Sequence, residues 1–371
     1  MAEIRVQNLH KAFAEFTAVK DSTFTVKNGE FFCLLGPSGC GKTTTLRMIA
    51  GLELPTSGEI FLGGNNVTRQ RASQRDIAFV FQLFALYPHM NVRENIAFPL
   101  VSQGLPRNEI DSRIADAART LQITHLLKSP VSGLSSGDRQ RVALGRAIVR
   151  KPMAFMMDEP LGALDAEFRE LMCGELRSLH DRLKATTVYV THDQREAMSM
   201  ADMIAIMNLG TVEQLGSPQE VYERPASVFV ADFVGAPAMN FLPFQGGFAL
   251  GDMQAQLGDQ TQIVPQLREV VSPRALLLGV RPEHVRLTDS APLRAQVLGT
   301  EYLGHNQIVV LETESGTRLR AKVPVQQRAV RGDQVGLAFD AAEISLFDTV
   351  SGRALQTARY DTPLTAGARH G

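Results

Sequence analysis

The residues best suited to do chemistry in this sequence form a glycine-rich segment, Gly-Pro-Ser-Gly-Cys-Gly-Lys-Thr, that runs from Gly36 to Thr43. It fits the pattern G-x-x-x-x-G-K-[ST], whose main-chain N–H groups curl around phosphate oxygens. Lys42 would supply a cation for the β- and γ-phosphates, and Thr43 a hydroxyl for Mg²⁺. The apolar run 31–35 before it and the helical pattern 42–51 after it provide the strand and helix that such a loop needs. The segment therefore predicts a nucleoside triphosphate site.

Two adjacent carboxylates, Asp158 and Glu159, end another apolar run that begins at residue 154. A carboxylate at a strand end can hold Mg²⁺ beside the threonine of a phosphate loop. Its neighbour can then polarise a water molecule for in-line attack on the γ-phosphate. On its own, such a pair is typical of a solvated strand end, and the phosphate loop upstream is what favours the catalytic interpretation.

The elements that must position these side chains alternate between strands and helices. Strands are predicted at residues 4–6, 22–26, 31–35, 154–157 and 186–191, and helices at 42–51, 108–128, 136–150 and 168–183. This order predicts a parallel α/β sheet. After about residue 235, short alternating segments at 276–280, 293–298, 307–312, 318–323 and 335–339 predict a small β-barrel or sandwich.

Composition sets limits on the partners and the compartment. The chain has 371 residues, enough for two domains, and its 38 basic and 39 acidic residues leave no positive excess for binding nucleic acid. Its three cysteines, Cys33, Cys40 and Cys173, match no disulfide or metal-site spacing, which favours a reducing compartment. No apolar stretch reaches the roughly 18 residues that a membrane span requires, although docking onto a membrane protein stays open.

Taken in chain order, the motifs resemble those of the ATP-binding-cassette (ABC) ATPases. The segment from Phe155 to Asp165 resembles the Walker B motif, catalytic glutamate and D-loop of that family, and Leu-Ser-Ser-Gly-Asp at residues 134–138 stands where the family has its signature motif. Val-Phe-Gln at 80–82 resembles the Q-loop, and Thr-His-Asp at 191–193 resembles the switch histidine. The resemblance implies an α/β P-loop NTPase fold, an ABC ATPase domain, over residues 1–235, with a helical subdomain at about 90–150.

A closer resemblance covers nearly the whole chain. Segments 85–89, 222–225, 233–241, 279–284 and 337–340 are similar to the ATPase subunit of maltose-type carbohydrate importers. This resemblance implies an all-β, OB-like (TOBE-like) regulatory domain over residues 236–371, which agrees with the predicted strands. It also implies an ATP-hydrolysing subunit that energises a membrane importer for sugars or related solutes.

The resemblance also implies roles for the residues at matching positions. Glu159 would be the general base, Gln82 would sense Mg²⁺ and the attacking water, and His192 would contact the γ-phosphate. Phe13 would stack on adenine, and Phe16 stays open as the stacking ring in its place. The implied ATP contacts are Phe13, Gly36, Pro37, Ser38, Gly39, Cys40, Gly41, Lys42, Thr43, Thr44, Ser135, Gly137, Asp138 and Asp165, and the implied Mg²⁺ contacts are Thr43, Gln82 and Asp158.

The implied active unit is a homodimer, with two copies arranged head to tail around two ATP molecules. In it, Ser135, Gly137 and Asp165 would act on the ATP held by the other protomer. The implied partners are two transmembrane permease subunits and an extracytoplasmic solute-binding protein, with the chain peripheral on the cytoplasmic side of the cell membrane. Two alternatives stay open: a soluble ABC ATPase that never meets a permease, and a weakly active regulatory cassette.

The signature motif departs from the family's usual Leu-Ser-Gly-Gly-Gln at two positions, Ser136 and Asp138. Asp138 would place a negative charge near the nucleotide of the other protomer, which predicts a slower ATPase with weaker ATP-driven closure. Alternatively, Asp138 turns toward ribose hydroxyls, as an acidic residue does in dinucleotide sites.

Overall fold

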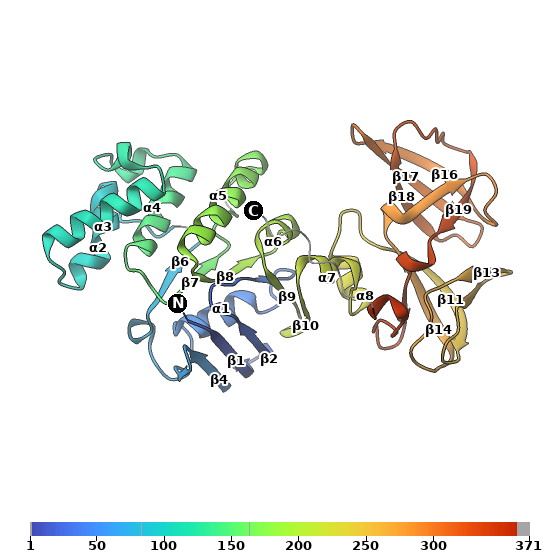
Figure 1. The fold of residues 1–371 in the computed structure, drawn as a ribbon, viewed down its shortest axis with the longest axis horizontal. Helices are drawn as coiled ribbons and strands as arrows, with labels where there is room; N and C mark the ends of the chain where they lie inside the picture. The colour runs from blue at the N-terminus through green and yellow to red at the C-terminus, as the bar shows by residue number, and fades with distance from the viewer. Residues whose placement is uncertain (1, 83, 163, 362–371) are drawn as a thin grey trace. The chain divides into compact units, whose positions relative to one another are not determined.

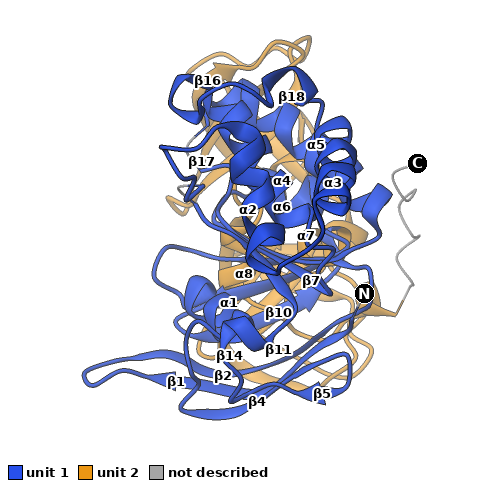
Figure 2. Cartoon of the chain, turned by 90° about the vertical axis from the view of Figure 1, so that its left-hand side faces the viewer, with its two compact units in different colours: residues 1–218 blue, residues 219–371 orange. Residues whose placement is uncertain are grey.

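In the computed structural model, which describes residues 2–82, 84–162 and 164–361, the chain divides into two compact units. The first comprises residues 1–218 and the second residues 219–371 (Figure 1, Figure 2). Two short helices, α7 (Pro218–Glu223) and α8 (Val228–Phe233), occupy the stretch between this division and residue 235. The domain boundary at residue 235 stays a prediction.

The first unit is built on a ten-stranded sheet with the order β5-β4-β1-β2-β10-β9-β3-β8-β7-β6. Its central strands β9, β3, β8, β7 and β6 pair in parallel, which confirms the predicted parallel arrangement for this part. The prediction is wrong for the flank, because β1, β2, β4 and β5 pair in antiparallel fashion. The strands are β1 (Ile4–Ala12), β2 (Thr17–Val26), β3 (Phe31–Leu35), β4 (Ser57–Leu62), β5 (Asn65–Asn66), β6 (Ile77–Val80), β7 (Ala154–Asp158), β8 (Thr186–Thr191), β9 (Met203–Asn208) and β10 (Thr211–Gly216).

The central strands bring the predicted chemical groups to one edge of the sheet. Every residue of β3, β7 and β8 is buried, as expected for parallel strands covered on both faces. Leu35 pairs with Thr191, and Asp158 pairs with Val190, so the carboxyl ends of the three strands lie side by side. The loops that follow these ends must therefore meet, which is where ligands bind in open α/β sheets.

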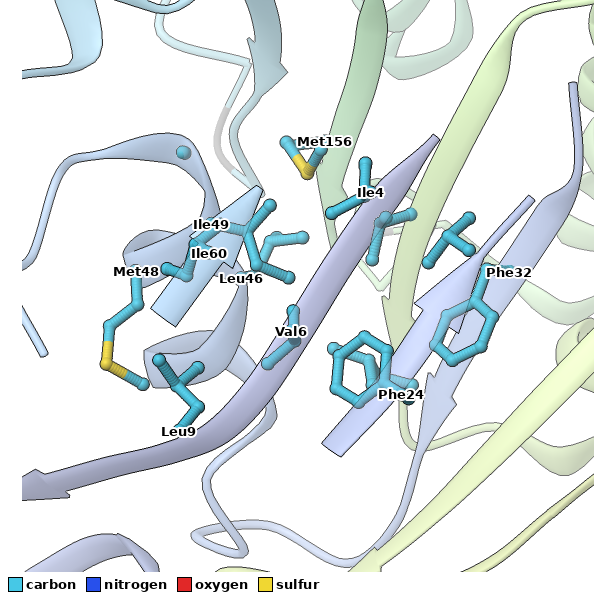
Figure 3. Packing of buried hydrophobic residues seen from close by; sticks show 14 of the residues in the cluster. Ile4, Val6, Leu9, Phe24, Phe32, Leu46, Met48, Ile49, Ile60 and Met156 are labelled. Carbon is cyan, nitrogen blue, oxygen red and sulfur yellow. The ribbon is translucent and has the colours of Figure 1, made fainter. Parts of the chain in front are cut away.

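The sheet and helix α1 (Lys42–Ala50) share one hydrophobic core. Figure 3 shows side chains of β1 and α1 pointing toward one another, among them Ile4, Val6, Leu46 and Ile49. Met156 of β7 joins the same cluster. This packing fixes the position of α1, whose first residues, Lys42 and Thr43, end the glycine-rich segment.

The described part of the first unit also contains the α-helices α2 (Val92–Ser102), α3 (Arg107–Thr120), α4 (Ser136–Ile148), α5 (Ala166–Leu183) and α6 (Gln194–Met200). Helices α2, α3 and α4 gather at one end of the unit (Figure 1). The helix predicted at 108–128 is wrong beyond residue 120, because Gln122 adopts the left-handed φ of 59° and ends it. Among the described residues, no helix has both the length and the apolar character of a membrane span.

Among its described residues, the second unit contains three sheets, all of them after residue 235, which confirms the all-β expectation for the C-terminal part. Their strand orders are β11-β14-β20, β12-β13 and β15-β19-β16-β17-β18. The five predicted segments fall within β14, β16, β17, β18 and β19, and the other five strands escaped prediction. The bounds are β11 (Asn240–Phe248), β12 (Gln254–Leu257), β13 (Gln260–Ile263), β14 (Val271–Val280), β15 (Val285–Thr288), β16 (Leu293–Tyr302), β17 (Asn306–Thr313), β18 (Arg318–Pro324), β19 (Gln334–Phe339) and β20 (Ser345–Asp348).

Candidate active site

The glycine-rich segment forms a tight loop between β3 and α1 that tolerates no larger residue at two positions. A Cβ atom at Gly36 would lie 2.3 Å from the carbonyl oxygen of Met207. At Gly41, where φ is 101°, it would lie 2.4 Å from the carbonyl oxygen of Ala18. Glycine is therefore required for the backbone to curl in this space, and the N-terminus of α1 adds a positive dipole end to it.

Lys42 lies inside this loop. Its side chain is almost fully buried, and its Nζ donates hydrogen bonds to the carbonyl oxygens of Gly36, at 2.8 Å, and Pro37, at 2.9 Å. These acceptors are neutral, so the contacts leave the positive charge available to an anion. A phosphate that entered the loop would meet a cation already aimed at its centre.

Thr43 and Asp158 form the pair expected to hold Mg²⁺. The Thr43 hydroxyl donates to Asp158 Oδ1 at 2.9 Å, which joins the start of α1 to the end of β7. Burial raises the pKa of the Asp158 carboxyl above its ordinary value, although the Thr43 hydrogen bond opposes this. Among the described residues there is no group of three or more acidic, histidine or cysteine side chains that would hold a metal alone. A hydroxyl and one carboxylate instead fit Mg²⁺, which takes its other ligands from phosphate oxygens and water.

Glu159, His192 and Gln82 meet beside this pair. Glu159 Oε1 lies 3.2 Å from His192 Nδ1, and its Oε2 accepts a hydrogen bond from Gln82 Nε2 at 3.4 Å. Glu159 has a φ of 45°, a left-handed conformation that costs energy in a residue with a side chain and is concentrated at functional sites. Its N–H donates to the carbonyl oxygen of Val190 at 3.0 Å, which helps to hold this conformation. The structure thus brings together the three side chains proposed for catalysis, while a metal contact of Gln82 stays a prediction.

The signature residues stand at the start of α4. Ser135 is the N-cap of this helix: its Oγ accepts from the N–H of Asp138 at 3.1 Å. The same hydroxyl donates a hydrogen bond to Asp138 Oδ2 at 2.7 Å. Its hydrogen is therefore already engaged by the carboxylate that departs from the family's usual motif. At Gly137, a Cβ atom would lie 2.3 Å from ring carbons of Phe168 on α5, which gives this glycine a packing role.

The roles of Asp165 and Phe13 in binding ATP stay predictions. Asp165 caps α5 by accepting from the N–H of Phe168 at 3.0 Å. The Phe13 ring stacks on Phe16 with centroids 5.3 Å apart, and both rings are exposed. Because Lys11 Nζ lies 4.8 Å from the Phe13 centroid, Phe13 is the better held of the two. The choice of adenine-stacking ring stays open.

Sequence reasoning missed a charged cluster beneath His192. Arg169, on α5, contacts the carboxylates of Asp193, at 3.0 Å, and Glu196, at 3.6 Å. Burial raises the pKa of the Glu196 carboxyl. Asp193 belongs to the Thr-His-Asp segment, but no motif marks Arg169 or Glu196; only the fold brings α5 against the loop that follows β8.

The chain is similar to known ATP-binding proteins of ABC transporters. The ABC transporter family model matches residues 19–162, and the TOBE domain model matches residues 278–347. The trehalose/maltose import ATP-binding protein MalK of Thermococcus litoralis is 46% identical, with 96% of this chain and 100% of that protein covered. The trehalose import ATP-binding protein SugC of Mycobacterium tuberculosis is 43% identical (95% and 98% covered), and the sn-glycerol-3-phosphate import ATP-binding protein UgpC of Cereibacter sphaeroides is 44% identical (96% and 100% covered).

Solved structures resemble more than half of the chain. The cbiO1 protein of Clostridium perfringens, part of an ABC transporter complex, matches with a TM-score of 0.56 at 28% identity, over 59% of this chain and 89% of that one. A bacterial ABC transporter cassette, solved as a dimer, matches with a TM-score of 0.52 at 30% identity, over 58% of this chain and 98% of that one.

Proposed function

This chain belongs to the family of ATP-binding subunits of ABC importers, and we propose that it hydrolyses ATP to energise a membrane importer for sugars or related solutes. The observation that carries the proposal is the meeting of Glu159, His192 and Gln82 beside the Gly36–Thr43 loop. The names of its relatives, importers of trehalose, maltose and glycerol 3-phosphate, support a carbohydrate or polyol-phosphate solute.

The site's residues divide the hydrolysis between them. The loop's N–H groups and the Lys42 ammonium bind the phosphates and oppose the charge that grows as the γ-phosphoryl group leaves. The carboxylate of Glu159 takes a proton from a water molecule, whose oxygen bonds to the γ-phosphorus as the bond to the bridging oxygen breaks. The products are ADP and inorganic phosphate. Mg²⁺, held by Thr43 and Asp158, would neutralise phosphate charge and align the two terminal phosphates.

His192 and Gln82 orient the reacting groups in this scheme. Both lie within hydrogen-bond reach of the Glu159 carboxylate, one at each oxygen. This fixes the carboxylate's rotation, so that one oxygen points consistently at the attacking water. Both side chains are exposed and so are accessible to a bound nucleotide.

The active unit would be a head-to-tail homodimer, since a similar cassette is a dimer in its solved structure. Ser135, Gly137 and Asp165 would then complete the site of the other protomer. Two permease subunits and a solute-binding protein would complete the importer, with this chain on the cytoplasmic face of the membrane.

Two other functions use the same fold. A soluble ABC ATPase that binds no permease would not copurify with membrane subunits when the permeases encoded by adjacent genes are coexpressed with it. The signature residues Ser136 and Asp138 are the evidence for a regulatory cassette with little ATPase activity. The contact between Glu159 and His192 argues against this function.

The test is Mg-ATP hydrolysis as a function of protein concentration, for the wild type, Glu159→Gln, and the control Glu314→Gln, which neutralises an exposed carboxylate of the second unit. We expect a rate that rises faster than linearly in the wild type and the control and is abolished in Glu159→Gln. Hydrolysis that survives Glu159→Gln would overturn the assignment of the base. Stimulation of the rate by coexpressed permeases together with one solute would then identify the cargo.

A further inference from the structure

One guanidinium joins three segments around the loop that carries His192. Arg169 donates from one terminal nitrogen to Asp193 Oδ2 at 3.0 Å, and from the other to the main-chain oxygen of Leu164 at 2.9 Å. Its Nε lies 3.6 Å from Glu196 Oε1. Leu164 directly precedes Asp165, Asp193 directly follows His192, and Glu196 is on α6.

Glu196 braces the same loop from inside the protein. It is 3% exposed, and its Oε2 accepts hydrogen bonds from the Tyr189 hydroxyl at 2.8 Å and the Thr191 hydroxyl at 2.6 Å. The Thr191 oxygen in turn accepts from the N–H of Asp193 at 2.9 Å. The residues on both sides of His192 are therefore held by hydrogen bonds.

Arg169 is the cation that contacts both carboxylates of this cluster, Asp193 and Glu196. Desolvation raises the pKa of Glu196, against the hydrogen bonds from Thr191 and Tyr189. Desolvation acts in the same direction on Asp193, but hydrogen bonds from Arg195 and Arg169 outweigh it and lower the pKa of that carboxyl. The two arginines differ in setting, because the Arg169 side chain is 24% exposed and the Arg195 side chain 80% exposed.

We propose that Arg169 is a positioning residue for ATP hydrolysis: it holds the loop at Asp193 so that His192 stays within reach of Glu159, and it ties that loop to the main chain preceding Asp165. The proposal rests on the proposed function, in which the contact between His192 and Glu159 serves hydrolysis. His192 is 55% exposed and has little packing of its own to orient it. Its ring position therefore depends on the main chain beneath it, and a shift of about 1 Å can cost about 100-fold in rate.

The experiment compares Arg169→Met and Arg169→Lys with the matched control Arg195→Met, which removes the exposed cation that contacts the same Asp193 oxygen at 3.3 Å. Steady-state kinetics give kcat and KM for Mg-ATP, and the melting temperature reports folding. We expect Arg169→Met to lower kcat by about 10- to 100-fold, with KM changed by less than about threefold. Arg169→Lys should restore part of kcat, because an ammonium reaches one partner but lacks the three-way fork of a guanidinium. Arg195→Met should stay within about twofold of the wild type.

A double-mutant cycle with His192→Ala separates positioning from a general structural effect. If Arg169 acts through His192, adding Arg169→Met to His192→Ala should lower kcat by less than about twofold. An equal loss in both backgrounds, or a kcat unchanged by Arg169→Met alone, would overturn the proposal. Should Arg169→Met fail to fold, Arg169→Lys takes its place in the same cycle. Failure of the proposed function looks different: the wild type would not hydrolyse ATP, or Glu159→Gln would remain active.

Discussion

Replacing Asp138 with glutamine removes a negative charge at the start of α4 and gives the Ser135 hydroxyl a weaker, neutral acceptor in place of a carboxylate. In the wild type, Ser135 Oγ donates to Asp138 Oδ2 at 2.7 Å. A hydroxyl engaged in this way cannot donate to the phosphate of a second protomer's ATP without first breaking that bond. We therefore predict that Asp138→Gln raises the maximal ATPase rate.

The magnitude follows from the bond that must break. A hydrogen bond to a charged acceptor contributes about 1.5–3 kcal/mol and one to a neutral acceptor about 0.5–1.5 kcal/mol, so the substitution removes roughly 1–1.5 kcal/mol from the bond that must break. About 1.4 kcal/mol corresponds to a tenfold change in an equilibrium, so closure of the dimer should become about tenfold more favourable. The same change should lower stability slightly, by about 0.3–1 kcal/mol, because an acidic residue in the first turn favours the helix dipole. Activity and stability should thus move in opposite directions.

The assay is Mg-ATP hydrolysis at saturating ATP, together with ATP-dependent dimerisation measured by gel filtration in a Glu159→Gln background. Asp138→Ala separates the two interpretations of the carboxylate. If the Asp138 carboxylate slows hydrolysis, both Asp138→Ala and Asp138→Gln should raise the ATPase rate. If it binds ribose hydroxyls, Asp138→Ala should lower the rate. Asp259→Gln, at an exposed turn of the second unit, controls for charge removal in general. An unchanged or lower rate in Asp138→Gln would refute the reasoning.

Three further predictions concern buried groups. Burial raises the pKa of Glu196 above its ordinary value of 4.5, so its stabilising contribution is present below that value and is lost as the pH rises through the folded pKa. Urea unfolding at about pH 5 and about pH 8 should therefore show the stability of Glu196→Gln improving relative to the wild type at the higher pH. Burial raises the pKa of the Cys40 thiol despite the nearby Lys42, so iodoacetamide at neutral pH should leave ATP hydrolysis intact; rapid inactivation would contradict this. Arg281, 1% exposed, donates to the carbonyl oxygens of Ala231, Tyr222 and Val234, and Arg281→Met should cost about 3 kcal/mol in urea unfolding by leaving them without this donor.

The parts of the site that the sequence predicts are those that local chain geometry determines. The loop at Gly36–Thr43 needs glycines where neighbouring carbonyls approach, and the sequence shows them directly. Asp158 ends one uninterrupted buried strand and His192 directly follows another, and parallel pairing of those strands is sufficient to bring their ends together. Periodicity and motif spacing record such constraints, so the sequence alone indicates that these residues lie close together.

The parts that the sequence does not predict depend on contacts between distant elements. Arg169 lies on an ordinary amphipathic helix, and only its approach to the loop after β8 gives it partners. The predicted strands 4–6 and 22–26 lie within β1 and β2, but their antiparallel pairing is not predicted, because it depends on which strands meet in the folded sheet. Helix α3 was predicted too long, since apolar spacing continues past Gln122 while the backbone there turns left-handed.

The same contacts decide which substitution can test the signature motif. Gly137→Ala would push a methyl group into the Phe168 ring, so a loss of activity would report damaged packing between α4 and α5 rather than a lost phosphate contact. Ser135→Ala would remove the N-cap of α4 and cost about 1 kcal/mol of helix stability along with any phosphate contact. Asp138 differs from both, because its substitution leaves the cap oxygen and the packed glycine in place and is predicted to increase the rate. A gain of activity cannot be produced by damage to the fold, and Asp138 is therefore the position at which the function of this motif can be decided.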